Sequence, residues 1–213
     1  MLSTGHKAAA APFGRVAMVA SLGGMQAFTA ILSRLPENFP VPIVVVQHRP
    51  RTSRGRDTLA AVLARKTLLP VTVAEVGGSA DLHGVTVIPG NTTATISPAG
   101  RWVLDVPDHQ LPGDALLISS ASNVPTIAVI LTGHLSDGSR GCRAVKSHGG
   151  RVLVQDPSTA RALSMPSNAV ATGCADFVLP LDRIPTALLA LTTAPGAADL
   201  LAVTLPPWAR LGS

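Results

Sequence analysis

The chain has 213 residues, a length typical of one domain with a substantial buried core. Hydrophobic residues make up 46% of it, but only four Phe, two Trp and no Tyr occur, so the core must be built mainly from aliphatic side chains. The net charge of +5 is spread thinly and aromatic platforms for base stacking are scarce, which argues against a nucleic-acid-binding protein.

Cysteine content and hydropathy argue against a disulfide-rich, zinc-binding, secreted or membrane protein. Cys142 and Cys174 are too few and too far apart to indicate a disulfide framework or a zinc clamp, so we interpret both as small core residues. Residues 1–14 lack the long apolar centre of a signal peptide, and no later run reaches the roughly 18 residues of a membrane span. We therefore expect a cytoplasmic protein without membrane insertion.

Short runs rich in Val, Ile and Ala recur along the chain and predict strands. Because these runs are continuously apolar, they are typical of strands covered on both faces, as in a parallel sheet. The segments between them have helical spacing. The sequence predicts an α/β fold with a doubly wound, mostly parallel sheet in three αβα layers, Rossmann-like. Strands are expected at 16–20, 41–46, 71–76, 126–131, 151–155 and 176–181, and helices at 25–35, 57–67, 138–150 and 164–173.

Two segments depart from this rhythm. Residues 84–106 alternate in polarity and are split by PGN and PAG turns, which predicts an antiparallel hairpin insert of two or three strands after the third strand. The C-terminal tail, residues 193–213, mixes Ala, Gly, Pro and Leu, and its sequence pattern predicts neither a helix nor a strand.

Three reactive side chains follow three of the expected strands. Ser21 follows the first strand, His48 the second, and Asp137 the strand at 126–131. In an open parallel sheet the carboxyl ends of strands form the functional crevice, so these side chains are expected to converge. A serine needs an imidazole to take its proton, and a carboxylate orients that imidazole. The pattern predicts a Ser-His-Asp site, with the helix after Gly23 and Gly24 offering free amides to an oxyanion.

Each of these residues also has a purely structural interpretation. A serine before a helix is commonly an N-cap, a single histidine is commonly structural, and an Asp-Gly pair is commonly a turn. Only their joint placement at three strand ends favours catalysis.

Several motifs together resemble the catalytic domain of the chemotaxis protein-glutamate methylesterases (CheB-type). They are ASLGG (20–24), VVVQH (44–48), LTGHLSDGSRG (131–141) and QDPSTARALSMPSNAVATGCADFVLPLDRI (155–184). The resemblance implies a catalytic domain over 14–192 in which Ser21, His48 and Asp137 hydrolyse glutamate γ-methyl esters on the cytoplasmic helices of methyl-accepting chemoreceptors. It also implies glutamine deamidation as a related activity, with no metal or organic cofactor.

The sequence departs from the family pattern beside the nucleophile. Leu22 stands where the family usually has threonine, and His134 and Leu135 stand where it has Met-Gly. By the resemblance, the backbone amides of Leu22 and His134 form the oxyanion hole. A glycine lost at position 135 matters if the loop there needs a positive φ. His134 is also near enough in sequence to compete with His48 for Asp137.

Basic residues cluster after the expected catalytic histidine. Arg49, Arg51 and Arg54 are candidate rim residues that steer an acidic substrate, and a solvated loop face is the alternative. By family analogy, Met165 marks a loop near the site.

Regulation and two rival functions complete the sequence-based expectations. The family's usual form carries a receiver domain before the catalytic domain, whereas here about 15 residues precede the first strand, so we expect a stand-alone domain. One rival is a dinucleotide-binding protein, which the absence of G-x-G-x-x-G spacing disfavours. The other is a binding module that keeps the fold but has lost turnover through the changes at Leu22, His134 and Leu135.

Overall fold

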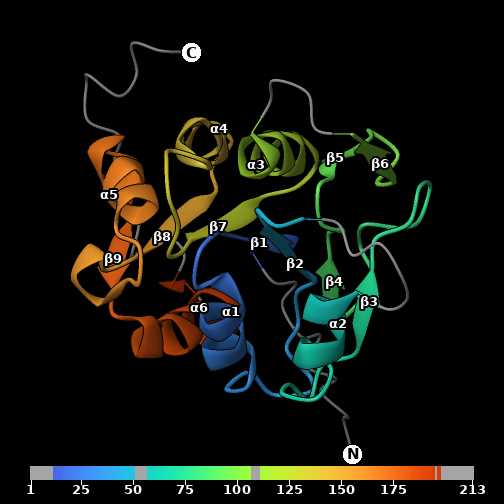
Figure 1. Cartoon of the computed structure of the whole chain (residues 1–213), viewed down its shortest axis with the longest axis horizontal. Helices are drawn as coiled ribbons and strands as arrows, with labels where there is room; N and C mark the ends of the chain where they lie inside the picture. Colours follow the sequence, from blue (N-terminus) through green and yellow to red (C-terminus); the bar gives the residue numbers. More distant parts are fainter. Residues whose placement is uncertain (1–11, 51–56, 107–110, 195, 198–213) are drawn as a thin grey trace, which may run out of the picture.

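The computed structural model describes residues 12–50, 57–106, 111–194, 196 and 197, and it contains a central parallel sheet between two layers of helices (Figure 1). The sheet has seven strands in the order β3-β4-β2-β1-β7-β8-β9, and every pairing within it is parallel. This confirms the predicted doubly wound α/β class. The strands are β1 (Arg15–Ala20), β2 (Ile43–Gln47), β3 (Val71–Val73), β4 (Val85–Val87), β7 (Thr126–Ile130), β8 (Arg151–Gln155) and β9 (Phe177–Leu179).

The first strand lies at the point where the winding of the sheet reverses. After β1 the chain builds β2, β3 and β4 on one side, and then β7, β8 and β9 on the other. All six residues of β1 are buried, because helices cover both faces of the sheet at this point. The carboxyl end of β1 is therefore the topological switch point, where ligands bind in open α/β sheets.

In the part of the chain that the structure describes, three α-helices cover each face of the sheet and pack against it in two separate cores (Figure 1). Phe28, Leu63 and Leu188 pack on one face, and Leu116, Cys142 and Ala169 pack on the other. The first face carries α1 (Gly24–Leu32), α2 (Thr58–Leu63) and α6 (Ile184–Thr193), and the second carries α3 (Pro112–Asn123), α4 (Ser139–Ser147) and α5 (Ser164–Ala171). Two short 3₁₀ helices, Pro157–Thr159 and Leu181–Arg183, connect elements at one end of the sheet.

The antiparallel insert is present but shorter than the sequence predicts. It consists of β5 (Thr93–Ile96) and β6 (Trp102–Asp105), which pair antiparallel beside α3. The assignment of residues 85–87 to this insert is wrong, because β4 is a parallel strand inserted between β2 and β3. Its Val-Thr-Val sequence alternates in polarity, yet all three residues are buried. A buried threonine thus imitates the pattern of a half-exposed strand.

Two helices have no counterpart in the sequence-based assignment. α3 begins at Pro112, just after residues 107–110, which lie outside the described residues, and α6 covers the sheet near its last strand. Most of the segment 193–213 also lies outside the described residues. Among the described helices, none is both long enough and apolar enough to cross a bilayer.

Candidate active site

Strand register places Ser21 next to His48. The parallel pairing of β1 with β2 sets Ala20 opposite Gln47, so the two following residues leave the sheet side by side. The His48 amide donates to the Ala20 carbonyl oxygen over 3.1 Å, which extends this pairing past the end of both strands. Because neighbouring strands lie about 4.8 Å apart, the serine and histidine side chains start from adjacent positions.

Hydrogen bonds fix the backbone of Ser21 on both sides. Its amide donates to the Thr132 carbonyl oxygen at 3.0 Å, and its own carbonyl oxygen accepts from the Gln47 side-chain amide at 3.0 Å. Among the described residues, neither the Ser21 hydroxyl nor the His48 ring makes a hydrogen bond. Both groups are therefore free to engage a substrate or each other.

The glycines after Ser21 are required by the shape of the turn. Gly23 has φ +84°, a left-handed conformation that favours glycine, and it caps the start of α1. A Cβ built on Gly24 would lie 2.7 Å from the Ala20 Cβ, so a side chain at this position would push the turn away from β1. Ser21 is therefore held directly before a helix N-terminus, where free amides favour negative charge.

Asp137 lies buried at the N-terminus of α3. Its side chain is 5% exposed, and its two carboxylate oxygens accept from the amides of Gly113 and Asp114, each at 2.9 Å. Burial raises the pKa of Asp137, while these two amides and the positive charge of His48 act in the opposite direction. The carboxylate thus has the surroundings expected of an acid that faces an imidazole.

His134 does not take the place of His48 beside this carboxylate. His134 is exposed and Asp137 is buried, and in the described part of the chain no hydrogen bond joins their side chains. His48 is the histidine whose charge acts on Asp137.

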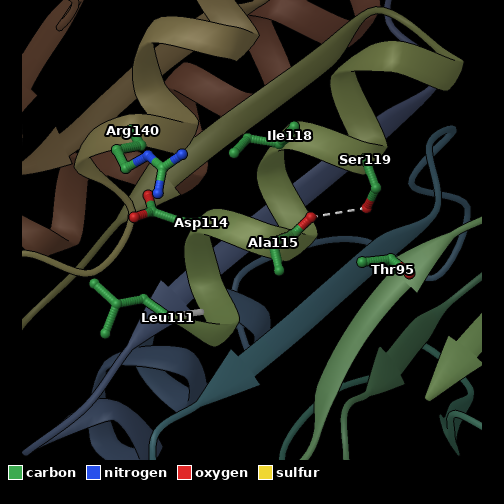
Figure 2. A pocket seen from close by; sticks show the side chains of 7 residues that line it. All are labelled: Thr95, Leu111, Asp114, Ala115, Ile118, Ser119 and Arg140. Atoms are coloured by element: carbon green, nitrogen blue, oxygen red, sulfur yellow. Dashed lines mark hydrogen bonds between the residues drawn. The ribbon is translucent and has the colours of Figure 1, made fainter. Parts of the chain in front are cut away.

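A second buried carboxylate, absent from the sequence-based site, supports the first. Asp114 accepts from the Gly141 amide at 2.8 Å, so it caps α4 while Asp137 caps α3. Figure 2 shows the guanidinium of Arg140 beside Asp114, at the edge of a pocket of about 160 Å³ lined mainly by α3. Burial raises the pKa of Asp114 and the charge of Asp137 acts in the same direction, whereas the Gly141 amide and the Arg140 charge lower it.

Two backbone amides beside Ser21 are available as donors. Among the described residues, the backbone amides of Leu22 and His134 make no hydrogen bond. The loops that carry them are held together by hydrogen bonds of Thr132. The Thr132 hydroxyl donates to the Leu22 carbonyl oxygen at 3.0 Å, and a Cβ built on Gly133 would lie 2.9 Å from the Ser21 Cβ. Both amides therefore belong to loops that lie beside Ser21 and remain candidate donors to an oxyanion.

Leu135 adopts the backbone conformation for which the family pattern has glycine. Its φ is +68°, in the left-handed region that non-glycine residues rarely occupy. The loop holds this strain through the Leu135 amide, which donates to the Ser164 hydroxyl, and the Leu135 carbonyl, which accepts from Asn168. The side chain itself is exposed and contributes little packing.

The candidate rim residues differ in where the structure places them. The Arg49 side chain is 14% exposed and pairs with Asp57 at 2.6 Å, and it also donates to the Ile88 carbonyl oxygen, so it braces the loop after His48. Arg51 and Arg54 lie outside the described residues. Met165 lies in the first turn of α5 rather than in a loop, and its sulfur packs under Gly133 at 1% exposure. Arg49 thus stabilises the loop after His48, and Met165 packs against the loop at Gly133.

Sequence reasoning also missed Gln155, which ends β8. Its side-chain oxygen accepts from the Thr132 amide at 3.0 Å and thereby fixes the loop that holds Ser21. A buried glutamine at a strand end next to the switch point is the signal that could have identified it. Within the described residues, no group of three or more His, Cys, Asp or Glu side chains is placed to hold a metal ion.

Comparisons with known proteins relate the chain to one family of enzymes. Residues 16–188 match a family model described as CheB methylesterase. The chain is 37% identical over 194 residues to a protein-glutamate methylesterase, FrzG, of Myxococcus xanthus, covering 84% of this chain and 54% of the relative. It is 36% identical over 205 residues to a protein-glutamate methylesterase/protein-glutamine glutaminase of Moorella thermoacetica, covering 85% of this chain and 45% of the relative. The crystal structure of the Thermotoga maritima CheB methylesterase catalytic domain superposes with a TM-score of 0.77 at 35% identity, covering 86% of this chain and all of that one.

We predict that Leu135→Gly stabilises the protein. Relief of a left-handed leucine is worth roughly 1–2 kcal/mol, and the greater freedom of glycine in the unfolded chain offsets roughly half of it. The free energy of unfolding should therefore rise by up to about 1 kcal/mol in urea denaturation. The matched control is Leu163→Gly, because Leu163 is similarly exposed but has φ −85°, and this variant should lose stability. An equal loss of unfolding free energy in both variants would show that the Leu135 backbone is not strained.

We predict that Asp114→Asn weakens the pH dependence of stability. A carboxyl whose pKa is raised by folding binds its proton more tightly in the folded state, so stability falls as pH rises from the unfolded-state pKa of about 3.9 through the folded one. Asparagine still accepts from the Gly141 amide but does not titrate. Denaturation at a series of pH values should show a shallower decline than in the wild type, while the exposed-residue control Asp105→Asn keeps the wild-type slope. An unchanged slope in Asp114→Asn would refute the prediction.

Proposed function

Because the chain belongs to the CheB methylesterase family, we propose that it is a serine hydrolase that converts glutamate γ-methyl esters in proteins to glutamate and methanol. The chain spans about half the length of the curated relatives it matches, so the proposal rests on its own residues. One observation carries it: Ser21 and His48 leave adjacent parallel strands at the switch point of the sheet, where the His48 charge acts on buried Asp137.

In the first half of the proposed reaction, Ser21 attacks the ester carbonyl. His48 takes the hydroxyl proton as the new C–O bond forms, and the carbonyl oxygen becomes an oxyanion. The free amides of Leu22 and His134 donate to that oxyanion. When the tetrahedral intermediate collapses, the C–O bond to the methoxy group breaks, and His48 returns its proton so that methanol leaves.

Water completes the reaction by the same route in reverse. His48 removes a proton from water, the resulting hydroxide attacks the acyl-enzyme, and the proton passes back to the Ser21 oxygen as the ester bond to the enzyme breaks. Asp137 holds the imidazole in one tautomer and stabilises its charged form throughout both halves. Its own position is held by the N-terminus of α3.

We extend the proposal to the substrate and its place in the cell. Methylated glutamates on the cytoplasmic helices of chemoreceptors are the proposed substrate, and the enzyme acts in the cytoplasm. Deamidation of glutamine by the same acyl-enzyme is a further proposed activity, since the amide differs from the ester only in its leaving group. Relatives named protein-glutamate methylesterase/protein-glutamine glutaminase support both chemistries.

A binding module without turnover is the second candidate function. The strained backbone of Leu135, next to one of the two proposed oxyanion donors, is the observation that favours it. The two candidates differ in one measurable property, the dependence of methanol release on Ser21.

We predict that Ser21→Ala abolishes methanol release from a methylated receptor fragment. Loss of the nucleophile should lower kcat by several orders of magnitude, ~10⁶ in a well-studied serine protease, and Asp137→Asn should lower it by about 10⁴ through the wrong tautomer of His48. The control Ser122→Ala removes an exposed hydroxyl on α3 and should keep the wild-type rate. Equal rates in wild type and Ser21→Ala would support the binding module instead.

A further inference from the structure

A segment after β8 is fastened to the loop that holds the nucleophile. The Ala162 amide donates to the Thr132 hydroxyl at 2.9 Å, and the Ala162 carbonyl oxygen accepts from the Gly133 amide at 3.0 Å. The Met165 amide donates to the Gly133 carbonyl oxygen at 3.0 Å. Since Thr132 in turn binds the Ser21 amide, the backbone next to Arg161 has a fixed position relative to Ser21.

The aliphatic part of Arg161 lies over the turn that carries Ser21. A Cβ built on Gly23 would lie 3.2 Å from both the Cβ and the Cδ of Arg161. Gly23 is only two residues after the nucleophile, so the arginine stem packs at the border of the site. The residue as a whole is exposed, which leaves its guanidinium toward solvent beside the turn that carries Ser21.

Unlike the other arginines described near the site, Arg161 has no carboxylate partner. Among the described residues it makes no side-chain hydrogen bond and no ion pair. Arg49 is paired with Asp57, and the Arg140 charge acts on Asp114 beside it (Figure 2). A cation placed at the site by packing, with its charge unused within the protein, is available for a substrate anion.

We propose that Arg161 is a specificity-determining residue that binds a carboxylate next to the scissile ester in an acidic polypeptide. The inference rests on the proposed function and deepens it. The methyl ester is itself neutral, so a cation at the rim can select substrates only through a neighbouring group. A planar guanidinium binds a carboxylate in bidentate fashion, and this contact forms when the acidic substrate docks.

The test compares two synthetic peptides that each contain one glutamate γ-methyl ester, flanked by glutamates in one and by glutamines in the other. We expect the wild type to prefer the glutamate peptide. Arg161→Ala should lower kcat/KM on that peptide about tenfold, mostly through KM, and leave the glutamine peptide nearly unchanged. Arg161→Glu should reverse the preference, and added salt should shrink the wild-type preference.

A matched variant controls for the loss of one positive charge. Arg101 is an exposed arginine that directly precedes β6 in the hairpin, so Arg101→Ala should keep the wild-type preference. Equal losses on both peptides in Arg161→Ala would overturn the inference, because they would indicate a disturbed catalytic loop. An unchanged preference in Arg161→Ala would overturn it too and leave the proposed function standing. Absence of hydrolysis of both peptides by the wild type would overturn the proposed function and this inference with it.

Discussion

The site depends on hydrogen bonding that continues past the carboxyl end of β1 on both of its sides. His48 donates to Ala20 from the side of β2, and Ser21 donates to the Thr132 carbonyl from the side of β7. The register of β1 is strongly specified, because a slip by one residue would move every one of its side chains from one packed face of the sheet to the other. The buried strand β1 therefore fixes the loop positions on either side of it, and the proposed nucleophile and base inherit that precision.

Two buried carboxylates complete the structure behind the imidazole. Asp137 caps α3 and Asp114 caps α4, and the amide of Asp114 is itself one of the donors to Asp137. Burial of a charge is costly unless hydrogen bonds replace water, and here helix N-termini provide the donors. The packing of α3 against α4 and the position of Asp137 are consequently one feature, so the helix that the sequence pattern did not predict is the one that holds the proposed catalytic acid.

Charge in the sequence did not reveal which arginine near the site lacks a carboxylate partner. Arg49 follows the proposed catalytic histidine directly, but its charge is neutralised by Asp57 and its side chain is mostly enclosed. Arg161 is distant from Ser21 in sequence, yet the hydrogen bonds that the next residue, Ala162, makes with Thr132 and Gly133 hold it over Gly23. The availability of a charge depends on its partners, and partners far along the chain are set by packing.

Local pattern alone determined the parallel class of the sheet, the strands that end just before Ser21 and His48, and the glycine turn that leads from Ser21 into the next helix. These features depend on runs of apolar residues and on turn chemistry, which act over a few positions. Only the tertiary structure decided that β4 joins the main sheet, that amides at the N-terminus of α3 donate to Asp137, and that His134 is exposed. Those outcomes depend on which buried groups find hydrogen-bond partners across the fold, and the short-range pattern of the sequence does not encode that choice.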